Sequence, residues 1–208
     1  MRHGLGKIYY SDTKVLYHGE FLNGKRNGEG KEYDEQGNTK YNGVWKNDKY
    51  NDTCGIYCIK GKRVYEGNWS MGKENGEGKS FYGNGVKDYN GEWRLGRKYG
   101  RGTAFYMNGA IKYEGCWRND HYHDEGTLYD EHGSVVFVGN WRYGKKEGTG
   151  KIYSDNRVLK FEGNFKEDLK NGFGIEFDDN GKIFYWLSKK GVRKLKENGK
   201  MTYVMGTY

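Results

Sequence analysis

Two histidines flanked by aspartates are the side chains of this sequence best suited to hold a metal ion. His121 and His123 stand between Asp120 and Asp124, and imidazoles at this spacing are suitable zinc ligands. A tetrahedral zinc site needs four ligands, and no third soft ligand follows at a fixed spacing. The pattern favours an exposed turn, and the sequence predicts neither a metal nor another cofactor.

Catalytic motifs are missing from the sequence. It contains no G-x-S-x-G, no Walker loop, no HExxH and no cysteine clustered with histidine and asparagine. Glycine pairs such as Gly28 and Gly30 resemble fragments of nucleotide-binding loops, but no helix follows them to receive a phosphate. We therefore predict that the chain is not an enzyme. An alternative is that it targets an enzyme whose catalytic domain lies outside these residues.

Lysine and arginine recur at two positions, one just after a recurring ring and one in the turn that follows. Because their spacing is constant, they are expected to stack into ladders along one edge of a sheet. Such ladders suit anionic partners, namely lipid head groups or acidic protein segments. The alternative is that they are solvated turn residues that discourage aggregation. The predicted anion-binding residues are Lys25, Lys46, Lys49, Lys73, Arg94, Arg97, Arg118, Arg142, Lys145 and Lys166.

Aromatic residues form a second recurring set, and they are the candidates for a partner-binding face. A single-layer sheet has no second layer to cover its apolar side, so a row of rings would form a large exposed patch. The alternative is that the rings pack on one another and form the core. Both interpretations can hold for different edges of one ring. The predicted partner-binding rings are Tyr41, Trp45, Tyr65, Trp69, Tyr89, Trp93, Tyr113, Trp117, Phe137 and Trp141.

The spacing of these residues identifies the elements that position them. An aromatic residue recurs every 24 residues, followed two positions later by glycine and two positions after that by a second ring. This alternation has a period of two, which places all three residues on one face of a β-strand. Seven repeats begin at Tyr17, Tyr41, Tyr65, Tyr89, Tyr113, Phe137 and Phe161.

A turn and a second strand complete each repeat. A turn such as Asn23-Gly24-Lys25 follows the first strand, paired glycines come next, and a third ring such as Tyr33 ends the second strand. Asn-Gly pairs such as Asn84-Gly85 then supply the positive φ angles that a tight turn needs. We therefore predict an all-β fold, an elongated single-layer antiparallel meander of tandem β-hairpins, twisted like a ribbon and capped at its ends.

The composition agrees with this architecture and narrows the partners. Of the 208 residues, 17% are aromatic and 34% hydrophobic, and proline is absent. The net charge of +8 favours anionic partners. Cys54, Cys58 and Cys116 provide no disulfide framework and no complete zinc ligand set, so they indicate a reducing compartment and structural thiols. We expect neither a signal peptide nor a membrane span, and predict a cytoplasmic location.

The third and fourth repeats resemble a known family. The third reads Tyr65-Glu66-Gly67-Asn68-Trp69, followed by Gly72-Lys73 and Gly76-Glu77-Gly78, and the fourth repeats this pattern from Tyr89. It is similar to the MORN (membrane occupation and recognition nexus) repeat, and the similarity covers residues 17–184. The resemblance implies an aromatic groove that holds partner segments. It also implies roles in cytoskeletal scaffolds, ciliary spoke heads, membrane junctions, or as an appendage to lipid kinases or methyltransferases.

The ends of the chain depart from the repeat. Residues 1–16 match the second half of a repeat and are predicted to form an N-terminal cap, before the seven repeats of residues 17–184. Residues 185–208 are predicted to form a degenerate C-terminal cap. There Tyr185 keeps the starting ring, but Leu187 and Lys189 stand where glycine and tryptophan are expected.

Repeats two and five also differ from the others. Asp48 and Asp120 stand where most other repeats have a turn glycine, and each repeat gains a tyrosine, Tyr50 or Tyr122. We therefore predict that the hairpin tips of these two repeats have a different shape.

The leading functional prediction is a protein–protein interaction scaffold or adaptor that works through the aromatic groove. Its partner would be a helical or extended protein segment or another repeat array, within a cytoskeletal or ciliary, radial-spoke-like axonemal assembly. The alternative is peripheral binding to anionic, phosphoinositide-type membranes through the cationic ladders. Nucleic acid is disfavoured, because acidic residues are interleaved with the basic ones and no base-stacking strand motif is present.

Overall fold

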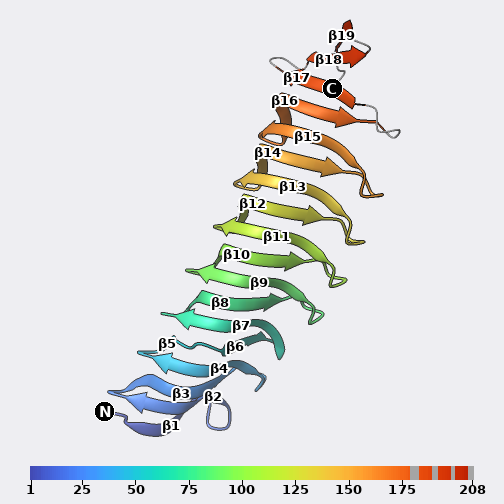
Figure 1. Cartoon of the computed structure of the whole chain (residues 1–208). Coiled ribbons are helices and arrows are strands. Elements are labelled where there is room, and N and C mark those ends of the chain that lie inside the picture. The colour runs from blue at the N-terminus through green and yellow to red at the C-terminus, as the bar shows by residue number, and fades with distance from the viewer. Residues whose placement is uncertain (179–182, 189–191, 198–199, 206–208) are drawn as a thin grey trace. The chain divides into compact units, whose positions relative to one another are not determined.

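The structure is a computed structural model, and it describes residues 1–178, 183–188, 192–197 and 200–205. The chain divides into two compact units, Met1–Gly109 and Ala110–Tyr208, called here the N-terminal and C-terminal units. Each unit is a row of antiparallel strands in which neighbours in sequence pair side by side (Figure 1). The predicted all-β meander of hairpins is confirmed. No helix in the described part of the chain could span a membrane.

The N-terminal unit holds ten strands, which pair in chain order apart from the short β5. Their bounds are β1 (Gly4–Tyr9), β2 (Val15–Leu22), β3 (Lys25–Tyr33), β4 (Thr39–Lys46), β5 (Lys49–Tyr50), β6 (Gly55–Ile59), β7 (Lys62–Ser70), β8 (Lys73–Phe81), β9 (Lys87–Arg94) and β10 (Arg97–Phe105).

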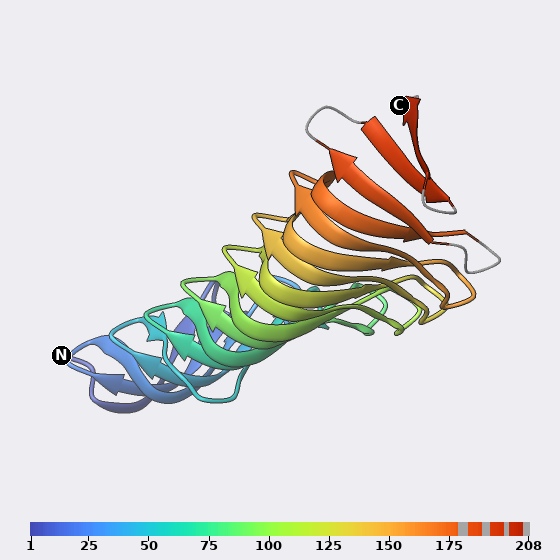
Figure 2. The same ribbon diagram turned by 45° about the horizontal axis from the view of Figure 1, so that its top comes forward.

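The C-terminal unit continues the same alternation of first and second strands. Its described strands are β11 (Ile111–Arg118), β12 (His121–Tyr129), β13 (Val135–Arg142), β14 (Lys145–Tyr153), β15 (Leu159–Lys166), β16 (Leu169–Phe177), β17 (Ile183–Ser188), β18 (Val192–Glu197) and β19 (Lys200–Met205). The strands of both units bend along their length (Figure 2).

The ring of each first strand lies across paired glycines. In the first repeat Gly19 of β2 pairs with Gly30 of β3, and a Cβ atom on Gly30 would clash with the ring of Tyr17. The same clash would occur in five further repeats. Only a residue without a side chain lets the ring lie this close to the backbone. The glycine and ring pairs are Gly30 and Tyr17, Gly78 and Tyr65, Gly102 and Tyr89, Gly126 and Tyr113, Gly150 and Phe137, Gly174 and Phe161.

Most second strands carry two glycines two residues apart, such as Gly28 and Gly30, and a β-bulge explains the first of them. The pairing of β2 with β3 shifts between Gly19 and Phe21, and Gly28 within the shift has a φ of 102°. A left-handed residue at a bulge favours glycine. In repeat five the equivalent residue is Asp124, with a φ of 50°.

The hairpin tips share one backbone shape, so the prediction that repeats two and five differ at their tips is wrong. The two tip residues of repeat one, Asn23 and Gly24, have φ angles of 53° and 79°, and Asn119 and Asp120 of repeat five have 51° and 69°. Both are therefore turns with two left-handed residues, a conformation that asparagine and aspartate tolerate. The carboxylate of Asp48 shows why aspartate is useful there, because it accepts a hydrogen bond from the backbone N–H of Arg26 at 2.9 Å.

Repeat two differs from the others inside its second strand. The strand is interrupted between Tyr50 and Gly55, where the carboxylate of Asp52 accepts backbone N–H bonds from Val44 at 2.7 Å and Cys54 at 3.0 Å. One extra residue enters the strand here, because Tyr41 pairs with the sixteenth residue after it, Tyr57, and not with the fifteenth as in repeat one.

A shorter turn removes this extra residue before the next repeat begins. Strand β6 ends at Ile59 and β7 starts at Lys62, joined by the two left-handed residues Lys60 and Gly61. In repeat one the corresponding connection runs from Tyr33 to Thr39. The 24-residue spacing of the sequence therefore conceals a local change of register.

The C-terminal end shows a second change of register. Strand β17 pairs with β16 so that Phe184 lies opposite Glu176 and Tyr185 opposite Ile175. Where repeat one meets repeat two, the starting ring Tyr41 lies opposite Glu32. Since a shift of one residue turns every side chain to the other face, Tyr185 is 41% exposed and does not continue the row of starting rings. Tyr185 therefore holds the starting position in the sequence but not in the sheet. Leu187 lies in β17, Lys189 lies outside the described residues, and the cap boundary at 185 stays a prediction.

Candidate functional site

The rings predicted to hold a partner form the core of each unit. Tyr17 meets Phe21 edge-on at 5.3 Å and Trp45 of the next repeat edge-on at 5.2 Å. The same arrangement continues at Phe137, whose ring meets those of Trp141 and Phe165. Edge-to-face contacts of this kind stabilise beyond the area they bury, so each repeat is held both to itself and to its neighbour.

The polar atoms of the rings are also satisfied within the sheet. The Tyr65 hydroxyl donates to the carbonyl oxygen of Asn68 at 3.1 Å, and Tyr17, Tyr41, Tyr89 and Tyr113 donate in the same way three residues ahead. The Trp69 indole N–H donates to the Gly55 carbonyl at 3.0 Å. Burial therefore costs these groups no hydrogen bond.

Burial of the hydroxyl groups opposes their ionisation. It raises the pKa of Tyr17 to about 12, and it raises the pKa of Tyr41, Tyr65 and Tyr113 further. At neutral pH these rings are uncharged.

Nine of the ten predicted partner-binding rings are buried, and their role in binding stays a prediction. They are Tyr41, Trp45, Tyr65, Trp69, Tyr89, Tyr113, Trp117, Phe137 and Trp141. Trp93 differs, because it packs on Tyr65 and Tyr89 but is only partly buried.

The second residue after each hairpin tip lies over a ring in six of the seven repeats, and we call its place the covering position. Arg26 holds this position in repeat one, with its guanidinium carbon 3.9 Å from the centroid of Trp45. Tyr50 stacks on Tyr41 at 3.8 Å and also meets Trp69 at 5.2 Å. The covering residues of the seven repeats are Arg26, Tyr50, Glu74, Lys98, Tyr122, Lys146 and Lys170.

Glu74 is the exception among these residues, and the second ring of the next repeat, Trp93, is only partly buried. A carboxylate offers no ring or cation to place over an indole. One carboxylate oxygen of Glu74 lies toward Gly96 at the neighbouring tip, 3.2 Å from where a Cβ atom would stand. The tyrosines at this position stand out in the sequence, but the covering role of the position could not be read from it.

A polar cluster lies over the rings of repeats one and two. Glu32 is 8% exposed and accepts hydrogen bonds from the Tyr50 hydroxyl at 2.6 Å and the Lys40 ammonium at 3.1 Å. The Arg26 guanidinium is 4.0 Å from the same carboxylate. Opposite charges thus neutralise this buried carboxylate. The cluster holds the covering residues Arg26 and Tyr50 in place.

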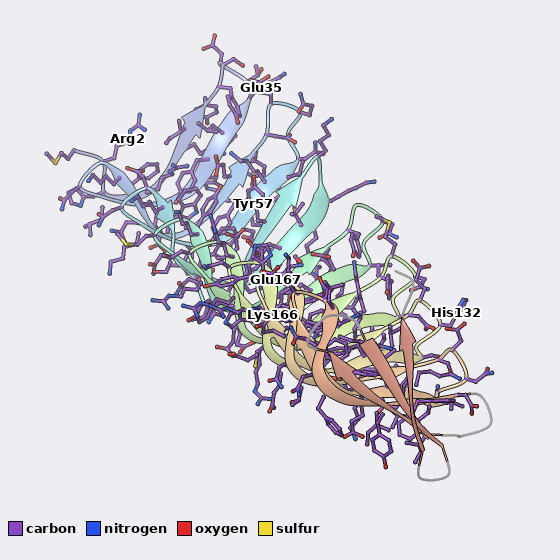
Figure 3. The ribbon with its side chains drawn as sticks, turned by 90° about the horizontal axis from the view of Figure 1, so that it is seen from above. Arg2, Glu35, Tyr57, His132, Lys166 and Glu167 are labelled. Carbon is purple, nitrogen blue, oxygen red and sulfur yellow. The ribbon has the colours of Figure 1, made fainter. Side chains whose placement is uncertain are left out.

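The predicted anion-binding cations stand beside the hairpin tips. Arg94 and Arg97 pair across the tip of repeat four, as Lys46 and Lys49 do in repeat two. All ten are exposed, and in the part of the chain that the structure describes none of them forms an ion pair. In the C-terminal unit Lys166 lies beside the acidic tip residue Glu167, both labelled in Figure 3. Within each unit the structure places these cations at the hairpin tips, but their binding role stays a prediction.

Cys116 lies opposite His123 in the pairing of β11 with β12, whereas Cys54 and Cys58 belong to repeat two. His121 and His123 both lie on β12, and the Nδ1 atom of His123 accepts the backbone N–H of Tyr143 at 3.3 Å. Cys54 lies in the interruption of repeat two and not within a strand, and all three cysteines are free thiols. Among the described residues, no three histidine, cysteine or acidic side chains lie close enough to hold a metal ion.

Comparison with known proteins identifies the repeated unit. The family model described as MORN repeat matches seven segments, which together cover well over half of the chain. The matched residues are 1–14, 17–39, 65–87, 89–111, 113–134, 137–157 and 161–182. Residues 40–64 between two of these segments contain the interrupted strand of repeat two. None of the curated proteins compared with the chain matches it.

Proposed function

Because the chain belongs to the MORN repeat family, a non-catalytic repeat family of protein and membrane interaction modules, we propose that it is a scaffold or adaptor that catalyses no reaction itself. It takes a segment of a partner protein along the ring-bearing face, within a larger cytoplasmic assembly such as a cytoskeletal or ciliary one. The partner segment is helical or extended, or part of another repeat array.

One observation carries this proposal, the accessible indole of Trp93. Tryptophan is the residue type most often found at the energetic centre of protein interfaces. Here its inner edge is fixed by the indole N–H bond to the Gly78 carbonyl at 3.1 Å and by the edge-on ring of Tyr65. A rigid, partly exposed ring binds a partner with little loss of side-chain entropy.

We expect Trp93→Ala to abolish recovery of the partner while the chain stays folded. Removing a central interface tryptophan commonly costs 2 kcal/mol or more, which is roughly a thirtyfold loss of affinity. The measurement is affinity capture from native cell extract at two salt concentrations, followed by mass spectrometry. A small set of proteins should be recovered in a fixed ratio at both salt concentrations with the unaltered chain.

Met71→Ala is the matched control, because Met71 is a large apolar residue that is 70% exposed at a hairpin tip. This variant should recover the same proteins as the unaltered chain. Equal recovery by a folded Trp93→Ala variant would show that the ring face is not the binding surface.

A second candidate function is peripheral attachment to anionic membranes. The observation that favours it is the exposure of all ten tip cations without an ion pair among the described residues. In the N-terminal unit the tips also carry exposed aliphatic side chains, such as Leu22, Met71 and Leu95. Successive tips within a unit lie two strands apart, roughly 10 Å, so several cations can meet one anionic surface.

Replacing four tip cations by glutamine is expected to weaken binding to phosphatidylserine-containing vesicles strongly, at about 1 kcal/mol for each charge. The measurement is vesicle co-sedimentation at rising salt, since screening should remove the attraction as well. The four residues are Lys25, Lys73, Arg94 and Arg97.

A control variant separates the position of the charges from their number. It carries glutamine at four exposed cations away from the tips, namely Lys7, Lys31, Lys79 and Arg101. Binding that is insensitive to salt, or equally weakened in both variants, would contradict a membrane role for the tips.

A further inference from the structure

Strand β1 has a position that can hold an aromatic ring but holds none, and we call this position, above Gly6, the seat. Gly6 of β1 corresponds to Gly30 of repeat one, since each pairs with the starting glycine of the strand that follows it, Gly19 or Gly43. At Gly30 a Cβ atom would clash with the ring of the preceding strand, Tyr17. At Gly6 it would meet only the edge of Phe21, at 3.2 Å.

The residues around this seat match those around the filled ones. In the C-terminal unit Phe137 lies opposite Ile152, and in the N-terminal unit Tyr89 lies opposite Ala104. Ile8 holds the equivalent place on β1, where its partly buried side chain offers the same apolar support.

Arg2 occupies the covering position of this incomplete repeat. Its carbonyl oxygen accepts the tip N–H of Gly24 at 3.0 Å, as the Arg26 carbonyl accepts the N–H of Asp48. Arg26 lies 5.6 Å from the ring centroid of Tyr17, which is the ring of its own repeat. Arg2 has only the ring of Phe21, at 5.8 Å, and is exposed at the outer end of the unit (Figure 3).

The outer edge of β1 is open as well. Among the described strands, β1 pairs only with β2, and no strand lies on its other side (Figure 1). Two large apolar residues of β1 are exposed, Leu5 by 78% and Tyr9 by 50%. An unpaired edge with exposed apolar side chains is a template for an added strand.

We propose that β1 binds an extended segment of a partner protein as an added antiparallel strand, with the sequence aromatic, any residue, glycine, any residue, aromatic. The first ring lies opposite Ile8, the glycine opposite Gly6 and the second ring opposite Arg2. This is the register by which Tyr17, Gly19 and Phe21 meet the equivalent residues of β3.

A second copy of this chain does not supply such a strand. In each unit the described strands with this pattern are already paired on both sides, as β7 is with β6 and β8, and β13 with β12 and β14. These strands are therefore not free to pair with β1, and we assign the added segment to a different protein. The site lies on β1 and is separate from Trp93, so it goes beyond the proposed function.

A synthetic peptide with the sequence of β9, Lys87–Arg94, tests the proposal directly. We expect saturable binding of the labelled peptide to the full chain by fluorescence anisotropy, with new protection of amide hydrogens in residues 4–9. A peptide with alanine in place of its tyrosine should bind at least about tenfold more weakly, because it loses the ring that fills the seat.

Gly6→Ala in the full chain should cause a similar loss, at least about tenfold, because its methyl group occupies the seat. The Phe21 edge needs to move only slightly at 3.2 Å, so the fold is expected to persist, as a thermal melt will show. Gly83→Ala is the control, because a Cβ atom there meets nothing within 4 Å. Trp93→Ala should leave peptide binding unchanged.

Three outcomes would overturn the proposal. The first is no saturable binding of the peptide. The second is equal affinity for the tyrosine and alanine peptides or for the Gly6→Ala chain. The third is a dimer of the unaltered chain that Gly6→Ala converts to monomer in light scattering, which would make a second copy the occupant.

Discussion

Gly78→Ala is expected to destabilise the chain by roughly 3 kcal/mol or more. Gly78 is buried beneath the ring of Tyr65, and an added Cβ atom would clash with the hydroxyl oxygen and two ring carbons of that tyrosine. The ring cannot retreat, because its hydroxyl is bonded to Asn68 and its edge packs on Trp69 and Trp93. The clash must be relieved by lifting the ring from the strand.

Gly83→Ala is the matched control for this effect. Gly83 lies in the connection between β8 and β9, where a Cβ atom meets no other atom within 4 Å. Its free energy of unfolding in urea should change by no more than about 0.5 kcal/mol. If both variants unfold at the same urea concentration, the flat ring over paired glycines is not what limits substitution at Gly78.

Alkaline unfolding between pH 10 and pH 12 is the second large effect we expect. The pKa of an unfolded tyrosine is about 10, whereas burial raises the pKa of Tyr17 to about 12 in the folded chain. This contribution to stability is fully present below pH 10 and is lost as the pH rises through the folded pKa. Four other tyrosines with raised pKa share this behaviour, namely Tyr41, Tyr50, Tyr65 and Tyr113.

The size of the effect follows from the number of rings. At pH 11 each ring has lost about 1.4 kcal/mol, so five rings have lost on the order of 7 kcal/mol. Typical domains are stable by only about 5–15 kcal/mol. Circular dichroism and phenolate absorbance should therefore change together, and phenolate absorbance that rises near pH 10 without loss of structure would contradict the prediction.

Replacing Tyr17, Tyr41 and Tyr65 by phenylalanine is the control for alkaline unfolding. Phe137 and Phe161 fill the same place without a hydroxyl, so the rings should still pack. Each lost hydroxyl bond should cost about 1 kcal/mol at neutral pH. The midpoint of alkaline unfolding should nevertheless move to higher pH. An unchanged midpoint would mean that other groups control it.

The repeated strands could be predicted from the sequence because the same alternation occurs seven times. A period of two with a glycine between two rings is compatible only with a strand, and the repetition removes the ambiguity of a single short segment. The fold of each repeat was therefore readable from residues such as Tyr65, Gly67 and Trp69.

The changes of register could not be predicted, because they depend on competition between local contacts. In repeat two the constant 24-residue spacing implies an unbroken second strand, but the Asp52 carboxylate binds three backbone N–H groups and holds a loop open. At the other end, Tyr185 stands at the right number in the sequence, yet Phe184 takes its place opposite Glu176. The spacing of residues gives only their position in the sequence. The register of a strand is set by the hydrogen bonds that it forms with the neighbouring strand.

The sequence predicted which residues make up the candidate site, but not which of them are accessible. The rings and cations were identified from their spacing, but whether a ring is exposed depends on the residue that covers it. Glu74 is one residue among seven at the covering position, and it is the one that has neither a ring nor a positive charge. Tip residues such as Asn119 and Asp120 were misjudged because aspartate tolerates the left-handed conformation nearly as well as glycine.

The compensated register of repeat two has an evolutionary consequence. The extra residue before Gly55 is offset by the short turn at Lys60 and Gly61, so strand β7 starts in the same frame as if nothing had changed. An insertion and a deletion within one repeat thus leave its neighbours unaffected. A gene built from such repeats can lengthen by duplication, and its copies can diverge one by one. A change of register inside one copy does not shift the strands of the next copy.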